Sequence, residues 1–198
     1  LSHHGNYCVK FVGDGSGPSD DYAYVWYSYG VAQTDVYTRI YFIIDALPSV
    51  DGEGWFLVEL TQIGGLHSVA FLMIYNDAGT VKWRIAYLDD GIAGYKYVVS
   101  TETVEANTWY CVEVHAKVDA AAAEVDVWID GSNVISVAGF DNDSSGGISR
   151  SQCGLRMNNA SPGATYTMYM DCAESANAYV GVESMNAAIK RSMIHGGI

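Results

Sequence analysis

Hydrophobic and polar residues alternate with a period of two along much of this chain of 198 residues. The alternation is clearest over 36–44, 109–118 and 124–130, where apolar residues such as Val125 and Val127 occupy every second position. Successive side chains of a β-strand point to opposite faces of a sheet. Each stretch therefore predicts a strand with one face on a core and the other in water.

Further runs have the composition of strands, because they are rich in Val, Ile, Tyr, Phe and Trp and are bounded by turn residues such as Asp51-Gly52. These runs are 7–12, 22–29, 55–60, 69–76, 81–87, 95–99, 134–137, 148–157 and 165–174. About a dozen short strands with almost no helical periodicity predict an all-β protein, a sandwich or a barrel.

The end of the chain departs from this pattern. Residues 183–192 place Met185, Ala188 and Ile189 at helical spacing, which predicts a short amphipathic helix or an extended arm. Such a tail needs a surface to dock on, its own or that of a neighbouring chain. We therefore predict one β-domain over 1–182 and a C-terminal tail over 183–198.

The composition is that of a globular protein, with 49% hydrophobic residues and 13% aromatic ones, including 15 Tyr. Only 17% of the residues are charged, against about 25% in an average soluble domain. The formal net charge of −13 argues against binding nucleic acid or an anionic membrane through a basic face. No apolar run reaches the length of about 18 residues that a membrane-spanning helix needs.

Four cysteines, Cys8, Cys111, Cys153 and Cys172, lack the C-x-x-C spacing of zinc or thioredoxin-like sites. They predict two disulfide bonds formed in an oxidising compartment, and three connectivities are open. Together with the acidic, Tyr-rich and Lys-poor composition, they predict a protein that is secreted or lies on the surface of a particle.

Two strand motifs carry a family resemblance. They are Thr108-Trp109-Tyr110-Cys111-Val112-Glu113-Val114 and Glu124-Val125-Asp126-Val127-Trp128-Ile129-Asp130-Gly131. With the strands at 6–11, 36–42 and 167–171, they make residues 5–182 resemble the laminin-G-like, concanavalin A-type jelly roll. The resemblance implies an antiparallel two-sheet sandwich, a fold that hosts lectins, adhesion modules, glycan hydrolases and lyases alike.

The resemblance also bears on the cysteines. The first and last strands are neighbours in the family's fold, which implies a Cys8–Cys172 disulfide and leaves Cys111 with Cys153.

The predicted hairpin 109–130 holds the sharpest candidate site. If Val118 faces Val125, then Lys117 lies opposite Asp126 and His115 opposite Trp128. The polar face of this hairpin then supplies the candidate glycan-binding residues, Trp109, His115, Glu124, Asp126 and Trp128.

Glu124 and Asp126 are also the candidate catalytic pair, because they lie two residues apart on one strand, about 6.5–7 Å along it. That separation is close to those of glycosidases. Related glucanases carry a Glu-x-Asp-x-Glu strand, and Trp128 stands here in place of the last acid, so the general acid/base is missing. The alternative, which we prefer, is an ordinary Lys117–Asp126 ion pair on a solvated sheet.

A lyase interpretation rests on Gln62-Ile63, His67 and Tyr95-Lys96-Tyr97, which faintly resemble the Gln/His and Tyr/Lys strands of jelly-roll alginate lyases. The matching Arg-x-Glu-Leu strand is absent. A loop histidine and a strand tyrosine are the simpler interpretation.

The segment Asp141-Asn142-Asp143-Ser144-Ser145-Gly146 begins like a calcium loop, with oxygen ligands at Asp141, Asp143 and Ser145. Gln152 stands where an EF-hand would supply its bidentate Glu, which excludes a full EF-hand site. One structural Ca²⁺ is the cofactor that the sequence predicts, and ordinary turn residues are the alternative.

Three functions remain open at this point. The first is a non-catalytic extracellular lectin-like module whose partner is a polysaccharide or glycan. The second is a structural subunit that assembles with copies of itself, in a filament or a virion surface, because aromatic residues occupy both faces of the run 22–29. The third is a glycan hydrolase that uses Glu124 and Asp126.

Overall fold

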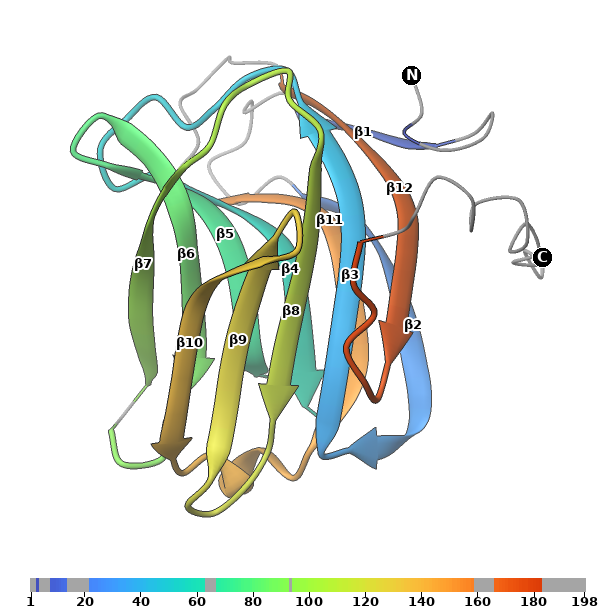
Figure 1. The fold of residues 1–198 in the computed structure, drawn as a ribbon, viewed down its shortest axis with the longest axis vertical. Coiled ribbons are helices and arrows are strands. Elements are labelled where there is room, and N and C mark those ends of the chain that lie inside the picture. Colours follow the sequence, from blue (N-terminus) through green and yellow to red (C-terminus); the bar gives the residue numbers. More distant parts are fainter. Residues whose placement is uncertain are drawn as a thin grey trace.

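The computed structural model describes residues 3, 8–13, 22–62, 67–92, 94–158 and 166–182. These residues form two six-stranded antiparallel sheets and one short 3-10 helix, Asp143–Ser145, which confirms the predicted all-β jelly-roll sandwich (Figure 1). Each run that was predicted to be a strand overlaps one. No helix in the described part of the chain is long and apolar enough to cross a membrane.

The first sheet, sheet A, is the one whose outer face is turned toward the viewer in Figure 1. Its strands, in spatial order, are β1 (Val9–Gly13), β12 (Tyr166–Ala176), β3 (Asp35–Ile44), β8 (Tyr110–Lys117), β9 (Ala123–Ile129) and β10 (Ser132–Phe140). All of its strand pairs are antiparallel.

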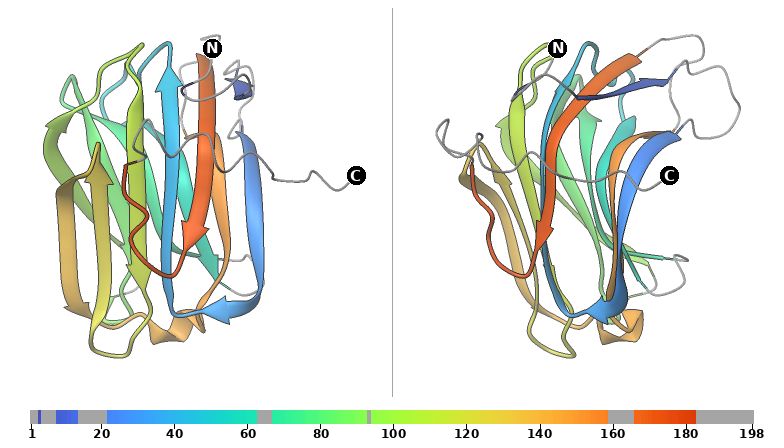
Figure 2. Two further views of the ribbon diagram at one scale, coloured as in Figure 1. Left: turned by 45° about the vertical axis from the view of Figure 1, so that its right-hand side comes forward. Right: turned by 90° about the vertical axis from the view of Figure 1, so that its right-hand side faces the viewer.

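The second sheet, sheet B, lies behind it. Its strands, in spatial order, are β2 (Tyr22–Gln33), β11 (Ile148–Asn158), β4 (Gly54–Gln62), β5 (Ser68–Asp77), β6 (Thr80–Leu88) and β7 (Tyr95–Thr103). Strands β2 and β11 bend along their length, with the concave side directed away from sheet A (Figure 2).

The core lies between the sheets and takes alternate residues from each strand. It includes Phe42, Trp55 and Trp83, which are fully buried, and the rings of Phe42 and Trp83 meet edge to face with centroids 5.9 Å apart. Burial of large aromatic side chains supplies much of the free energy that holds two such sheets together.

The outer face of sheet A is not in water along β3 and β8, contrary to the prediction from alternation. Residues 177–182, here called the terminal segment, follow β12 and cross this face. Val180 and Gly181 donate backbone N–H bonds to the two carboxylate oxygens of Glu113, at 2.6 and 2.8 Å. Arg39 donates to the Gly181 carbonyl at 2.8 Å. Arg39 and Glu113 are therefore only 2% exposed.

His3 also covers part of this face, beside Tyr41 of β3. The His3 ring stacks on Tyr41 with centroids 4.2 Å apart, and its backbone N–H bonds to Asp171 at 3.0 Å. Tyr41 lies on the outer face of sheet A and is buried under this contact.

The register of the β8–β9 hairpin differs by two residues from the prediction. Ala116, not Val118, faces Val125. The reason is that the Val118 N–H bonds to the Thr34 carbonyl at 2.8 Å, so Val118 leaves the hairpin for the β2–β3 turn. A shift of two residues keeps every side chain on its predicted face, because side chains alternate with the same period.

The predicted disulfide Cys111–Cys153 is wrong, since no two of the four cysteines are joined. The thiol of Cys111 lies on the outer face of sheet A beside Tyr41, whereas Cys153 points from sheet B into the core. The backbone of sheet A separates the two sulfur atoms.

The predicted disulfide Cys8–Cys172 is not formed either. Strands β1 and β12 are neighbours, as expected, with Val9 opposite Met170. Continued by one residue, this register places Cys8 opposite Asp171, with Cys172 one residue further on. The two cysteines are therefore not cross-strand partners. The predicted tail, residues 183–198 with Met185, Ala188 and Ile189, lies outside the described residues.

Gly154 in β11 sets how closely β2 approaches. A Cβ atom at this position would lie 2.3 Å from the Ala23 carbonyl oxygen and 2.6 Å from the Tyr24 Cα. Both are backbone atoms of β2, which cannot rotate aside as a side chain can. Glycine is therefore needed for β2 to pair with β11 here, and β2 carries Trp26 onto the outer face of sheet B.

We expect Gly154→Ala to lower the free energy of unfolding by about 3 kcal/mol, the upper end of the usual cost of overpacking. Gly139→Ala is the matched control, because Gly139 also has a positive φ (77°) but a Cβ atom added there would meet nothing within 4 Å. It should cost about 1–2 kcal/mol for the backbone alone. Urea denaturation measures both, and equal losses would show that the close approach of β2 does not require Gly154.

Burial also predicts the reactivity of two thiols. It raises the pKa of Cys111 to about 11 and that of Cys153 to about 12. Since the thiolate is the reactive form, about one thiol in a thousand or fewer is ionised at about pH 8. Both should resist iodoacetamide in the native protein and react after unfolding, as mass spectrometry of the peptides would report. Rapid native labelling of Cys153 would contradict this burial.

Candidate functional site

The outer face of sheet B carries a continuous row of side chains across all six strands. Each member lies directly opposite the next in the strand pairing, so all point to the same side. The row is Trp26, Gln152, Glu59, Phe71, Ala86 and Tyr97. Five inter-strand spacings of about 4.8 Å give it a length of about 24 Å.

The ends of this row are exposed and aromatic. Trp26 is 59% exposed and Tyr97 is 50% exposed. In the middle, Phe71 and Ala86 are buried although they lie on an outer face, because Phe56, Tyr75 and Tyr95 pack over them. The centre of this outer face is therefore a packed apolar cluster.

Three of the four arginines in the described residues lie on or beside this face, namely Arg84, Arg150 and Arg156. A second row on the same strands, two to four residues away from the first, holds Arg156, Phe56, Met73 and Arg84 in strand pairing. Arg150 lies two residues before Gln152 on β11, and its guanidinium is 5.5 Å from the ring centroid of Trp26. This face thus concentrates positive charge in a chain whose formal net charge is −13.

Arg84 is held between two tyrosine rings. Its guanidinium carbon lies 4.2 Å from the ring centroid of Tyr75 and 4.0 Å from that of Tyr97. A guanidinium over an aromatic face is attracted by the ring quadrupole. No carboxylate in the described residues forms an ion pair with Arg84, and its buried Nε has no hydrogen-bond partner there.

Arg156, unlike Arg84, has a carboxylate partner, Glu59. Arg156 lies 4.9 Å over the ring of Phe56, and its guanidinium is 3.8 Å from Glu59. Glu59 also accepts hydrogen bonds from Ser68 and Gln152. The negative charge of Glu59 is therefore already engaged, whereas Arg84 and Arg150 have no anionic partner among the described residues.

Sequence reasoning named neither Arg84 nor Arg150. Their strands were predicted correctly, but a single arginine in an alternating strand is what a solvated sheet also shows. The signal that could have found them is the occurrence of outward arginines and outward aromatic residues on the same strands and their neighbours.

The residues of the lyase interpretation fall on this same sheet. Gln62 and His67 close the end of the β4–β5 hairpin, where the Gln62 N–H bonds to the His67 carbonyl at 3.0 Å. The Tyr95 hydroxyl accepts a hydrogen bond from the Ser68 N–H at 3.0 Å. His67 is exposed, as expected for a loop histidine.

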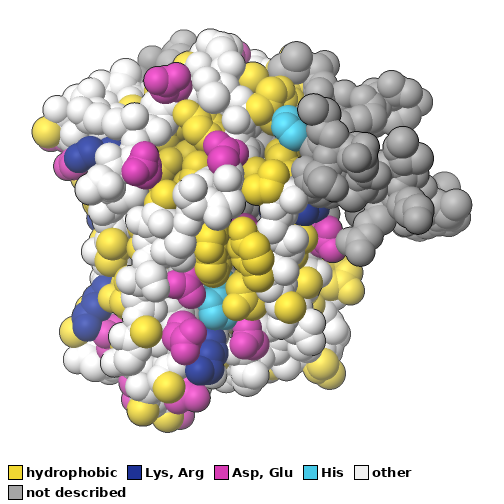
Figure 3. All heavy atoms as spheres, in the orientation of Figure 1, with side chains coloured by type: hydrophobic (Ala, Val, Ile, Leu, Met, Phe, Trp, Pro, Cys, Tyr) yellow, Lys and Arg dark blue, Asp and Glu magenta, His cyan; other side chains and the backbone are white. Residues whose placement is uncertain are grey.

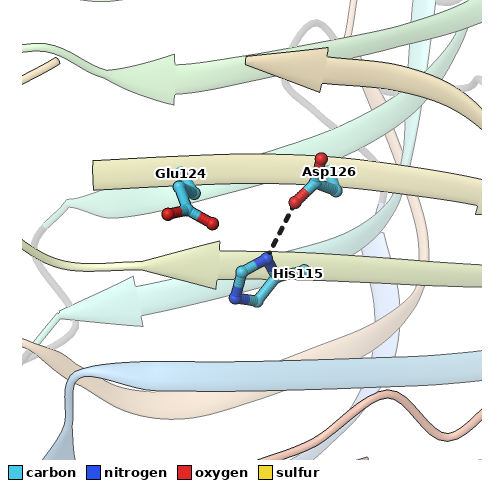
Figure 4. Close-up of side chains that lie close together, drawn as sticks. All are labelled: His115, Glu124 and Asp126. Carbon is cyan, nitrogen blue, oxygen red and sulfur yellow. Dashed lines mark hydrogen bonds and ion pairs between the residues drawn. The ribbon is translucent and has the colours of Figure 1, made fainter. Parts of the chain in front are cut away.

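The predicted hairpin site lies on the opposite, outer face of sheet A, and Figure 4 shows three of its side chains, His115, Glu124 and Asp126. His115 Nδ1 lies 3.0 Å from an Asp126 oxygen, and Nε2 lies 3.0 Å from Asp35. Glu124 pairs with Lys117 at 3.2 Å, in place of the Lys117–Asp126 pair that the sequence predicted. Acidic side chains outnumber basic ones on this face in Figure 3.

Two pKa shifts follow from these contacts. Burial acts to lower the pKa of His115, but the hydrogen bonds with Asp126 and Asp35 outweigh it and raise the pKa above its ordinary value. Burial acts to raise the pKa of Asp126, but hydrogen bonds from His115, Ser136 and Asn133 outweigh it and lower the pKa.

The five predicted glycan-binding residues are not all brought together. His115, Glu124, Asp126 and Trp128 are neighbours, but Trp109 precedes β8 and lies about 20 Å from His115 along the strand. The His115 ring is stacked under Tyr37, with centroids 4.1 Å apart, and is 3% exposed. Their role in glycan binding, and a hydrolase role of Glu124 and Asp126, stay predictions.

The structure brings together two of the three predicted calcium ligands. Carboxylate oxygens of Asp141 and Asp143 lie within 4.8 Å of each other and of Asp90. Ser145, the third predicted ligand, is buried, and its hydroxyl accepts a hydrogen bond from the Gly147 N–H at 3.3 Å. Ca²⁺ binding at this loop stays a prediction.

The predicted aromatic strand is β2. Tyr24 and Trp26 lie on the outer face of sheet B, and Val25 and Tyr27 lie on the core side but are 40% and 61% exposed. Aromatic residues on both faces are confirmed. Self-assembly through them stays a prediction.

No protein-family model and no curated protein matches the chain. Solved structures match its fold. The cellulose-induced protein Cip1 is 21% identical, with a TM-score of 0.60 over 92% of this chain and 85% of that one. A family 7 alginate lyase, A1-II′, is 12% identical, with a TM-score of 0.62 over 89% of this chain and 80% of that one.

An alginate lyase from Pseudomonas aeruginosa is 11% identical, with a TM-score of 0.57 over 77% of this chain and 68% of that one. At such identities the similarity shows the fold alone. The chain has the concanavalin A-like jelly-roll fold, as the resemblance implied, and the finer likeness to laminin G domains stays a prediction.

Proposed function

We propose that this protein binds acidic polysaccharides on the outer face of sheet B, as a carbohydrate-binding module of an extracellular or particle surface. The observation that carries the proposal is Arg84, a guanidinium fixed between Tyr75 and Tyr97 without a carboxylate partner in the described residues. In a chain with 23 acidic and 10 basic residues, a cation without an internal counter-ion needs a reason. An anionic ligand supplies one.

The chemistry of the face suits a sugar acid in particular. A planar guanidinium forms two parallel hydrogen bonds with a planar carboxylate, which a lysine cannot do. Exposed aromatic rings such as Trp26 and Tyr97 offer apolar faces against which sugar rings stack. The row of about 24 Å provides room for several linked sugars rather than one.

The comparisons support the same ligand class. Two of the structures that share this fold are alginate lyases, and alginate is a polymer of uronic acids. The third is a cellulose-induced protein. A glycan-related function on this fold is thus in keeping with the structures it resembles.

We expect Arg84→Gln to weaken binding to alginate or polygalacturonate about 10- to 100-fold. A hydrogen bond to a charged group contributes about 1.5–3 kcal/mol, and about 1.4 kcal/mol is a factor of ten in affinity. Isothermal titration calorimetry with defined oligouronates measures this. Arg150→Gln should act in the same direction.

Lys10→Gln is the control, because it removes the same charge from the exposed strand β1 at the edge of sheet A. It should leave the affinity unchanged. Affinity for alginate should also fall as salt rises, whereas neutral dextran should not bind. Equal binding of dextran and alginate, or full affinity in Arg84→Gln, would contradict the proposal.

A second function, β-elimination, is favoured by the contact of Tyr97 with Arg84. In such a lyase reaction a base removes the C5 proton beside the uronate carboxylate, the C4=C5 double bond forms, and the C4–O4 bond breaks. The departing oxygen takes up a proton. Arg84 would neutralise the carboxylate, and the Tyr97 oxygen would take the C5 proton and return a proton to the departing O4.

Ultraviolet absorbance of unsaturated sugar ends distinguishes the two functions. If the protein is a lyase, alginate should yield this absorbance, and Tyr97→Phe should abolish it while binding stays within about twofold. If the protein only binds, no absorbance develops and Tyr97→Phe leaves the complex intact. Product formation that survives Tyr97→Phe would exclude Tyr97 as the proton-transfer group.

A further inference from the structure

We propose that His115, Glu124 and Asp126 bind a divalent transition-metal ion on the outer face of sheet A, opposite the proposed glycan-binding face. One nitrogen of His115 and one oxygen of each carboxylate lie within 4.8 Å of one another. Figure 4 shows both carboxylates on β9 directed toward the imidazole on β8. The site is independent of the proposed function.

The strands fix the spacing of these ligands. Glu124 and Asp126 are two residues apart on β9 and so share a face, and Asp126 lies directly opposite His115 on β8. Zinc–nitrogen and zinc–oxygen distances of about 2.0–2.2 Å place tetrahedral ligand atoms about 3.4 Å apart. The 3.0 Å between His115 Nδ1 and Asp126 is close to this value. The Glu124 side chain is 41% exposed, so it can rotate toward the ion.

The surroundings of His115 resemble those of a histidine that ligates a metal. Such a histidine usually donates its second N–H to a carboxylate, which fixes the ring and its tautomer. Asp35 holds Nε2 in this way at 3.0 Å, and Tyr37 stacks on the ring with an interplanar angle of 11°. Nδ1 is then the ring nitrogen that faces Glu124 and Asp126, where an ion would take the place of a proton.

The donor set selects the class of ion. One imidazole and two carboxylates suit Zn²⁺ and its first-row neighbours, whereas Ca²⁺ takes six to eight oxygen ligands. The Lys117 ammonium lies 3.2 Å from Glu124 and would repel a metal cation bound beside it. Its charge should reduce the affinity for the ion without abolishing it.

Equilibrium dialysis of the full chain against Zn²⁺ alone, in a buffer without chelators, tests the site. We expect about one ion per chain and a higher melting temperature when it is bound. His115→Gln and Glu124→Gln should each weaken binding at least tenfold. Glu124→Gln changes a partly exposed side chain and keeps the test valid should His115→Gln fail to fold.

Three further variants separate this site from alternatives. Asp35→Asn, which does not touch the ion, should weaken Zn²⁺ about 10- to 100-fold through the ring of His115, and Lys117→Gln should strengthen it. Asp90→Asn, in the separate acidic cluster with Asp141 and Asp143, should change nothing. The proposal is overturned if no stoichiometric ion binds, if binding survives Glu124→Gln, or if Asp90→Asn removes it.

Discussion

The Glu113 carboxylate decides which outer face of the sandwich is open. Its two oxygens accept the backbone N–H groups of Val180 and Gly181, and it lies beside the buried Arg39. A buried charge is tolerable only with such partners, so the terminal segment 177–182 is bound to sheet A. On sheet B, by contrast, Trp26 is more than half exposed and Tyr97 is half exposed. The two outer faces of the sandwich therefore differ in what covers them.

Charge is distributed to match this asymmetry. On sheet A, the His115 ring lies between the carboxylates of Asp35 and Asp126. On sheet B, Arg84 lies between the rings of Tyr75 and Tyr97 instead. A formal net charge of −13 therefore does not describe the local potential of either face, and it excludes anionic partners only where acidic groups gather. An acidic protein can bind an acidic polymer where a cluster of its few cations has no internal carboxylate.

The strands were predictable because alternation is a local property, read from four to ten neighbouring residues. Two features were not local. The hairpin register depends on a bond from Val118 to Thr34, and the burial of Arg39 depends on Gly181, far along the chain. The arginine-bearing face likewise joins Trp26, Arg84 and Arg150, which share one face only after the sheet has formed. Sequence alone cannot show which side chains surround Arg84, because its tyrosine neighbours are a property of three-dimensional packing.

The two tyrosine rings around Arg84 also alter the entropy of any encounter with an anion. An arginine side chain in water has about 2 kcal/mol of rotamer entropy to lose when it is immobilised. Between Tyr75 and Tyr97 much of that freedom is already lost when the protein folds. An anion that reaches this face meets a guanidinium that is ordered in advance, so less of the interaction is offset by ordering. The direction from which this guanidinium can offer its parallel N–H groups is then set by the fold and not by the ligand.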